Sequence, residues 1–300
     1  MSTSEQRLPT ERLAGMTSAA LRERAAIDPS YEGPVRGRLL VVEDNDVNQL
    51  VARSTVAKFG YAVDVVANGA EAVAAVEITE YDGVLMDCHM PVMDGFEATR
   101  IIRSRETGNS PLPIIAMTAG ALDGDRERCL AAGMDDYLAK PVDATDLEAL
   151  LARWVPDHVT PFLPEQPLAV TGSYPAMTSE YPRQGLDQSR LAILRDLGPS
   201  DGLGLLPAAA EAFRTDVPDR IASLNQAIND NDGQALTQAA HALKGAAANI
   251  GATTAAALCG ELEALGSTGK HNGALQLVSR LEAELAHVNI ELDQALDAAP

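Results

Sequence analysis

The sequence predicts two domains of different fold class: a doubly wound α/β domain with a five-stranded parallel sheet, followed by an all-α domain. Three observations predict this division. Between residues 37 and 154, five short apolar runs alternate with stretches of helical periodicity. Six prolines interrupt residues 155–185, where no apolar period is sustained. From residue 186 onward the chain is rich in Ala, Leu, Glu and Gln at helical spacing, and no strand pattern recurs.

The apolar runs of the first domain have the length and the bounded ends of buried strands. They lie at residues 39–42, 62–66, 83–86, 114–117 and 137–139. Between and after them, helical periods lie at residues 47–59, 70–76, 96–102, 126–132 and 144–154. Strand followed by helix, five times in succession, predicts a parallel sheet covered by helices on both faces. In such sheets, functional sites form beyond the carboxyl ends of the strands.

The rest of the chain divides into three parts. Residues 1–36 are an N-terminal extension with one candidate helix at 11–27, to which the sequence assigns no role. Residues 155–185 are predicted to be a Pro-rich linker that joins two domains without fixing their geometry. Residues 186–300 form the second domain, a small antiparallel helix bundle. Its candidate helices are 187–197, 203–230, 232–249, 253–266 and 271–297, separated by glycines and turn-forming residues.

Composition excludes several classes of function. The chain carries 43 acidic and 23 basic residues, a formal charge of −20 spread along its length. This balance argues against binding to nucleic acid or to anionic membranes. The chain has three cysteines, an odd number, and they form no CxxC or zinc-binding spacing: Cys88, Cys129 and Cys259. This usage fits a reducing cytoplasm. No apolar segment is long enough for membrane insertion, and the N-terminus lacks a secretory apolar core. We therefore expect a cytoplasmic protein.

Acidic side chains, and side chains that can bind a phosphoryl group, lie at the predicted strand ends. Glu43 and Asp44 end the first strand and Asp87 ends the third, so the three carboxylates should meet at one edge of the sheet. Crowded carboxylates repel one another unless a hard cation joins them, and an oxygen-rich site suits Mg²⁺. Thr118 and Lys140 end the fourth and fifth strands. Carboxylates, a hydroxyl, a lysine and a metal are what an aspartyl nucleophile needs to accept a phosphoryl group.

Over roughly residues 37–154 the sequence resembles the bacterial response-regulator receiver family, which has a flavodoxin-like fold. The matching segments are Val41–Asn45, Met86–Gly95, Thr118–Ala119 and Lys140–Pro141. The resemblance implies that Asp87 is the phosphoacceptor. It also implies that Mg²⁺ is held by Glu43, Asp44 and Asp87, with the backbone carbonyl of His89 as a further ligand. The His89 side chain itself is expected to be exposed rather than ligating.

The resemblance assigns roles to three further residues. Thr118 and Lys140 would contact the phosphoryl group, and Tyr137 stands where the family carries its switch aromatic. Each position also has an ordinary structural alternative. The carboxylates could be solvated strand ends or helix caps, Lys140 a surface lysine and Tyr137 a partly buried strand aromatic.

A histidine in the second domain is the other candidate for chemistry. His241 and Lys244 lie three residues apart on one face of a predicted helix, where a cation can steady a phosphoryl group. A glycine such as Gly245 destabilises a helix interior by about 1 kcal/mol relative to alanine. A glycine is favoured despite this cost where another surface must approach the helix closely.

The segment His241–Ala252 looks like the signature of histidine-containing phosphotransfer (HPt) domains. That resemblance, over about residues 187–297, implies a four-helix bundle with an exposed, phosphorylatable His241 assisted by Lys244. Alanines replace the serines that frequently follow the family's Lys-Gly pair.

Together these features predict a two-component phosphorelay intermediate. Asp87 would accept a phosphoryl group from an upstream sensor histidine kinase, and His241 would exchange phosphoryl groups with a receiver aspartate. The downstream partner would be a response-regulator receiver or an HPt protein. The sequence contains no nucleotide-binding glycine motif and no helix-turn-helix pattern, so neither its own ATP-dependent kinase activity nor DNA binding is expected.

Three alternatives remain open at this point. The chain could be the C-terminal part of a hybrid sensor histidine kinase. It could be a regulator in which phosphorylation of Asp87 shifts the face between Thr118 and Tyr137 while His241 is inert. Finally, a magnesium phosphohydrolase would use His89 as its acid–base residue, although Lys140–Pro141 favours the receiver.

Overall fold

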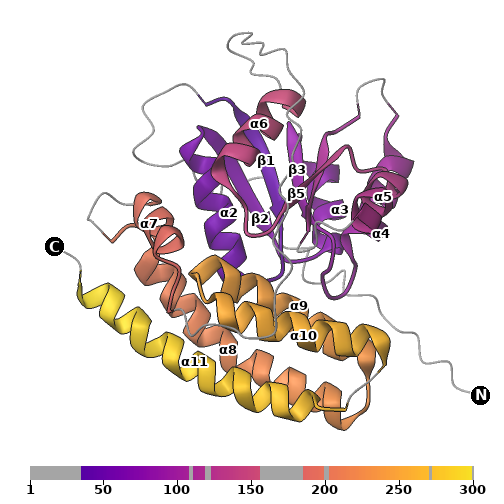
Figure 1. Ribbon diagram of the computed structural model, residues 1–300. Helices are drawn as coiled ribbons and strands as arrows, with labels where there is room; N and C mark the ends of the chain where they lie inside the picture. The colour runs from indigo at the N-terminus through magenta and orange to yellow at the C-terminus, as the bar shows by residue number, and fades with distance from the viewer. Residues whose placement is uncertain are drawn as a thin grey trace, which may run out of the picture. The chain divides into compact units, whose positions relative to one another are not determined.

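We describe the protein from a computed structural model, which covers residues 35–107, 111–118, 123–155, 185–198, 203–269 and 272–298 (Figure 1). The chain forms two compact units, and each is considered by itself. The predicted extension 1–36, with its candidate helix 11–27, lies almost entirely outside the described residues. So does nearly all of the predicted linker 155–185, and the domain boundaries therefore stay predictions.

The first unit is a five-stranded parallel sheet with the strand order β2-β1-β3-β4-β5. Its strands are β1 (Gly37–Val42), β2 (Tyr61–Val66), β3 (Gly83–Asp87), β4 (Ile114–Thr118) and β5 (Asp136–Ala139). Its helices are α2 (Asp46–Lys58), α3 (Gly69–Ile78), α4 (Gly95–Arg105), α5 (Asp123–Ala132) and α6 (Ala144–Trp154). All five predicted strands and all five predicted helices are present, and the predicted fold class is confirmed.

Side chains alternate between the two faces of the sheet and build a core on each. Leu40 and Val42 of β1 pack with residues of α3, α4 and α5. Leu39 and Val41 point the other way and pack with residues of α2 and α6. Both faces of the central strands are therefore covered, which is why their sequences are continuous apolar runs rather than alternating ones.

The strand order places a topological switch point between β1 and β3. The connection after β1 leads through α2 to β2 on one side, whereas β3 lies on the other side of β1. Adjacent loops therefore diverge at the carboxyl ends of β1 and β3, and such a switch point is where open α/β sheets bind ligands. Glu43 and Asp44 follow β1, and Asp87 is the last residue of β3.

Several elements extend further than the apolar pattern predicts. Strands β3 and β4 continue by one residue to the buried polar residues Asp87 and Thr118. Helix α4 runs on to Arg105, and in this extension the Nε of the partly buried Arg103 donates to the carbonyl of Gly133 at 2.8 Å. A pattern of apolar spacing does not detect polar residues such as Asp87, Thr118 and Arg103 at the ends of elements.

The loop between β3 and α4 folds back tightly on the end of β3. A Cβ added at Gly95 would lie 2.1 Å from the carbonyl oxygen of Asp87, so only glycine allows this approach. Asp94 caps α4, and its Oδ1 accepts the Glu97 N–H at 2.7 Å. The tip of the loop is Val92, whose φ of 71° is uncommon for a β-branched residue. The loop is therefore anchored at both ends around Asp87.

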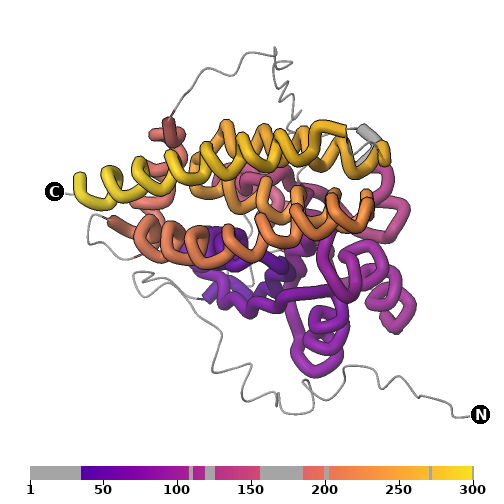
Figure 2. The backbone as a smooth tube through the Cα atoms, turned by 90° about the horizontal axis from the view of Figure 1, so that it is seen from below, coloured from indigo at the N-terminus to yellow at the C-terminus, as the bar shows by residue number. Residues whose placement is uncertain are grey.

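The second unit is helical, as predicted. It contains the short helix α7 (Gln188–Asp196) and the long helices α8 (Leu206–Asn229), α9 (Gly233–Ile250), α10 (Thr253–Thr268) and α11 (Ala274–Asp297). Helices α8 to α11 pack in a closed ring, each against the next and α11 against α8, which makes a four-helix bundle (Figure 2). Helix α7 packs on α8 and α9. Among the described helices of both units, none combines the length and the apolar character needed to cross a membrane.

Close packing of α9 against α10 gives a first prediction. A Cβ at Gly266 would lie 2.5 Å from Thr237 Oγ1 and 2.7 Å from the carbonyl oxygen of Gly233, so Gly266→Ala should destabilise the bundle by about 1–3 kcal/mol. The control is Gly260 on the same helix, where a Cβ would meet Lys244 Cε at an ordinary 3.9 Å. Gly260→Ala should raise the free energy of unfolding by up to about 1 kcal/mol. Urea unfolding followed by circular dichroism measures both, and equal stability of the two variants would contradict the packing argument.

Candidate functional site

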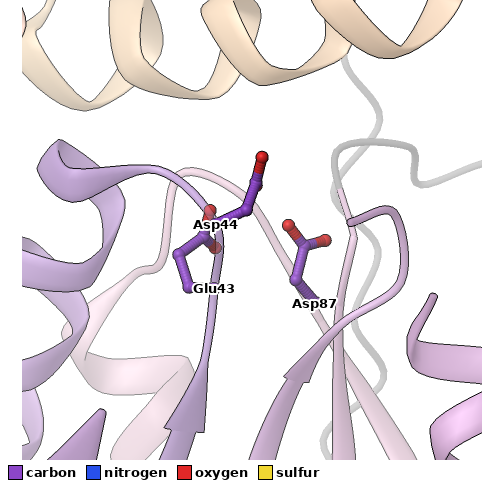
Figure 3. Close-up of side chains that lie close together, drawn as sticks. All are labelled: Glu43, Asp44 and Asp87. Carbon is purple, nitrogen blue, oxygen red and sulfur yellow. The ribbon is translucent and has the colours of Figure 1, made fainter. Parts of the chain in front are cut away.

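Three carboxylates meet at the carboxyl edge of the sheet. Glu43 and Asp44 come from the end of β1 and Asp87 from the end of β3 (Figure 3). One carboxylate oxygen of each residue lies within 4.8 Å of the others. Glu43 and Asp87 are each 1% exposed, whereas Asp44 is partly exposed. Two of the three carboxylates are thus buried, and that of Asp44 is partly accessible to solvent. The three side chains offer only oxygen donors, which fits Mg²⁺.

Lys140 supplies the positive charge inside this cluster. Its Nζ lies 2.5 Å from Glu43 Oε2 and 2.7 Å from Asp87 Oδ2, and the side chain is buried. Burial by itself would lower the pKa of Lys140, but the carboxylates of Asp87 and Glu43 outweigh it and hold the pKa above its usual value. The lysine therefore stays charged at neutral pH. One ammonium facing three carboxylates leaves an excess of negative charge that a divalent cation would offset.

The Glu43 carboxylate is held on both of its oxygens. Lys140 contacts Oε2, and the amide of Asn48, which the sequence analysis did not single out, donates to Oε1 at 2.8 Å. Burial raises the pKa of Glu43 to about 7, with Lys140 opposing the rise and Asp87 adding to it. The pKa of Glu43 is therefore set by its burial and by the opposing charges of Lys140 and Asp87.

Thr118 and His89 lie where the sequence analysis places them. Thr118 is 3% exposed at the end of β4, and its carbonyl accepts the N–H of Lys140 at 2.7 Å, which ties together the ends of β4 and β5. The backbone N–H of His89 donates to Asp87 Oδ1 at 3.2 Å. Its imidazole is exposed, as expected, and lies edge-on to Phe96 with ring centroids 5.7 Å apart. Residues 119–122, which follow Thr118, lie outside the described residues.

Tyr137 lies in β5, one strand away from Thr118 in the sheet. It is partly buried and pairs with Ala116 of β4. The guanidinium of Arg126 lies 5.9 Å from its ring centroid, in the range of a cation–π contact.

In the second unit, His241 belongs to a triad of side chains from two helices. His241 and Lys244 of α9 share one face, as predicted from their spacing, and both contact Glu263 of α10. The Nδ1 atom of His241 lies 2.8 Å from Glu263 Oε1, and Lys244 Nζ donates to Glu263 Oε2 at 3.1 Å. Burial alone would raise the pKa of Glu263, but its bonds to His241 and Lys244 lower it to about 2. Glu263 is therefore ionised and holds both basic groups.

The structure differs from the expected exposure of His241. Its resemblance to phosphotransfer domains implies an exposed imidazole, but the residue is only 8% exposed. The Glu263 carboxylate of α10 covers one side of the ring, with its Oε1 atom 2.8 Å from Nδ1. The sequence analysis did not identify Glu263, because pairing across two helices depends on their relative register, which helical periodicity does not set.

Comparison with known proteins identifies both units. The family model described as a response regulator receiver domain matches residues 39–152, and the model described as an Hpt domain matches residues 208–298. The sensor histidine kinase GacS of Pseudomonas protegens is 33% identical over 237 residues, which are 76% of this chain and 24% of that protein. Probable histidine kinase 1 of Oryza sativa subsp. indica is 36% identical over 167 residues, 46% of this chain and 17% of that protein. The chain thus spans about a quarter or less of these relatives.

Among solved structures, one similar protein is the receiver domain of the sensor histidine kinase PA1611 from Pseudomonas aeruginosa. It is described as having a magnesium ion coordinated in its active site cleft. It is 52% identical and aligns with 40% of this chain and 97% of that one, with a TM-score of 0.37.

Proposed function

The chain carries a response regulator receiver domain followed by an Hpt domain, and we propose that it is a phosphorelay intermediate with two phosphoryl stations, Asp87 and His241. The observation that carries the proposal is the arrangement around Asp87. Its carboxylate is buried beside two other carboxylates and is contacted at 2.7 Å by the Lys140 ammonium. A carboxylate with a cation at one oxygen and a metal-compatible cluster beside it is suited to forming an acyl phosphate.

The first transfer is a displacement at phosphorus. A carboxylate oxygen of Asp87 forms the new P–O bond while the P–N bond of a donor phosphohistidine breaks, and the departing imidazole nitrogen takes up a proton. Lys140 offsets charge on the phosphoryl oxygens, and the Thr118 hydroxyl donates a hydrogen bond to one of them. Mg²⁺ would be held by the side chains of Glu43, Asp44 and Asp87 and by the backbone carbonyl of His89. When bound, it supplies further charge neutralisation.

The second station is His241, with its orientation set by Glu263. If Nδ1–H donates to the ionised Glu263, the ring is fixed in the tautomer that leaves the lone pair on Nε2. Nε2 then attacks phosphorus while the acyl phosphate P–O bond of a receiver breaks, and Lys244 offsets charge on the phosphoryl group.

The partners follow from this chemistry. The upstream donor is a sensor histidine kinase, in keeping with the histidine kinases among the similar proteins. The downstream acceptor or donor for His241 is a response-regulator receiver, and an Hpt protein can exchange with Asp87.

Dependence on a divalent cation tests the proposed chemistry at Asp87. We expect the full chain to take up label on Asp87 from radiolabelled phosphoramidate, a small P–N donor, in the presence of Mg²⁺. Removing the cation with EDTA should slow this labelling by at least about a hundredfold, because Lys140 alone then offsets the negative charge of the cluster and of the phosphoryl group. Restoring Mg²⁺ in excess of EDTA is the control. Equal labelling rates with and without the cation would refute the assignment of a magnesium-dependent station.

A further inference from the structure

We propose that Asn48 is a positioning residue that orients the Glu43 carboxylate toward the divalent cation and so sets the affinity of the receiver site for Mg²⁺. The inference rests on the proposed function, because it concerns the cation that Glu43, Asp44 and Asp87 would share. Asn48 belongs to none of the residues that the sequence analysis assigned to the site.

The geometry around Glu43 carries the inference. The carboxylate is 1% exposed, and two donors from different elements hold its two oxygens. Asn48 Nδ2 donates to Oε1 at 2.8 Å and Lys140 Nζ to Oε2 at 2.5 Å. Two donors fix the plane of a carboxylate, whereas a single donor leaves it free to turn toward that donor. Without Asn48, Glu43 would be held by Lys140 alone.

Asn48 is itself held in place by the start of α2. It is the third residue of the helix and 4% exposed, and its backbone N–H donates to Oδ1 of the N-cap residue Asn45 at 3.1 Å. Burying a side-chain amide costs free energy unless the amide is hydrogen-bonded. The bond to Glu43 offsets this cost, so the helix start and the acidic cluster are built as one rigid piece.

The neutral charge of the Asn48 amide also favours cation binding at the cluster. The amide of Asn48 is neutral, so it supports the Glu43 carboxylate without adding positive charge to the cluster. Lys140 already supplies one cation to both Glu43 and Asp87. A second basic residue in place of Asn48 would repel a divalent ion, whereas the amide preserves the negative charge that attracts it.

The test measures Mg²⁺ binding to the full chain by isothermal titration calorimetry. Asn48→Ala should weaken Mg²⁺ binding about ten- to hundredfold, as is typical for removal of a partner that orients a metal ligand. Asn48→Leu, which lacks the donor but fills more of the space, should do the same. The matched control is Gln49→Ala. The Gln49 side chain donates to the backbone carbonyl of Glu43 at 2.7 Å, not to its carboxylate, and its removal should change affinity by less than about threefold.

A double-mutant cycle separates positioning from a general structural effect. In a Glu43→Gln background, Asn48→Ala should cause almost no further loss of Mg²⁺ affinity, because the carboxylate it orients is gone. Additive losses would overturn the inference. So would wild-type affinity in both Asn48 variants, provided that urea unfolding in EDTA shows them folded. Absence of Mg²⁺ binding to the wild-type chain would instead overturn the proposed magnesium site, so the two failures are distinguishable.

Discussion

The Asp87→Asn chain is expected to take up no phosphoryl group on its receiver domain. The amide has nearly the shape of the carboxylate and can still accept from Lys140, but it lacks the nucleophilic anion that forms an acyl phosphate. We expect the labelling rate from phosphoramidate and Mg²⁺ to fall by at least about a thousandfold, the scale on which removal of a nucleophile acts. The measurement is the alkali-labile radiolabel, since acyl phosphates hydrolyse in base.

A matched control for this variant is Asp46→Asn. Asp46 is an exposed acid in the first turn of α2, close in sequence to Glu43 and Asp44 but outside the cluster of three carboxylates. The Asp46→Asn variant carries the same change from acid to amide and should keep nearly the full labelling rate. If alkali-labile label persists in Asp87→Asn at the rate of Asp46→Asn, the phosphoacceptor is a different residue.

Replacing His241 with glutamine should remove the second station and leave the first intact. Phosphohistidine is labile in acid and stable in base, so its loss can be followed separately from the acyl phosphate. We expect the alkali-stable label in His241→Gln to fall by at least about a thousandfold while the label on Asp87 stays. His287→Gln is the control, because His287 is an exposed histidine on α11 of the same bundle.

Glu263→Gln refines the same prediction. It keeps the His241 ring but removes the ionised carboxylate that holds Nδ1 at 2.8 Å, so labelling of His241 should slow rather than vanish. If the alkali-stable label in His241→Gln is unchanged, that label is carried by another residue. An unchanged rate in Glu263→Gln would mean that Glu263 does not orient the ring.

The fold could be predicted from the sequence because its strongest signals are local. The buried strands of the first unit read as continuous apolar runs, and helical spacing between them fixes their parallel connection. Convergence of Glu43, Asp44 and Asp87 also follows from topology, since neighbouring parallel strands end at one edge. The structure brings these three carboxylates together, and Lys140, which was also expected at this edge, contacts Asp87 at 2.7 Å.

The contacts that refine the two sites could not be predicted. Asn48 and Glu263 act across elements, and which side chains meet there depends on rotamers and on how one helix is rotated against its neighbour. The contact between His241 and Glu263 has the same origin, because the 3.6-residue period identifies the face of α9 that carries His241 but not which side chain of α10 meets it. Spacing along one helix, as between His241 and Lys244, was predictable because helix geometry alone determines it.

The most direct test of two stations compares the wild-type chain with the double variant Asp87→Asn, His241→Gln. Both are incubated with radiolabelled phosphoramidate and Mg²⁺, and the label is sorted by its stability in acid and in base. We expect the wild type to carry an alkali-labile label on Asp87 and an alkali-stable label on His241, and the double variant to carry neither. A double variant labelled to the wild-type level would contradict the assignment of these two stations.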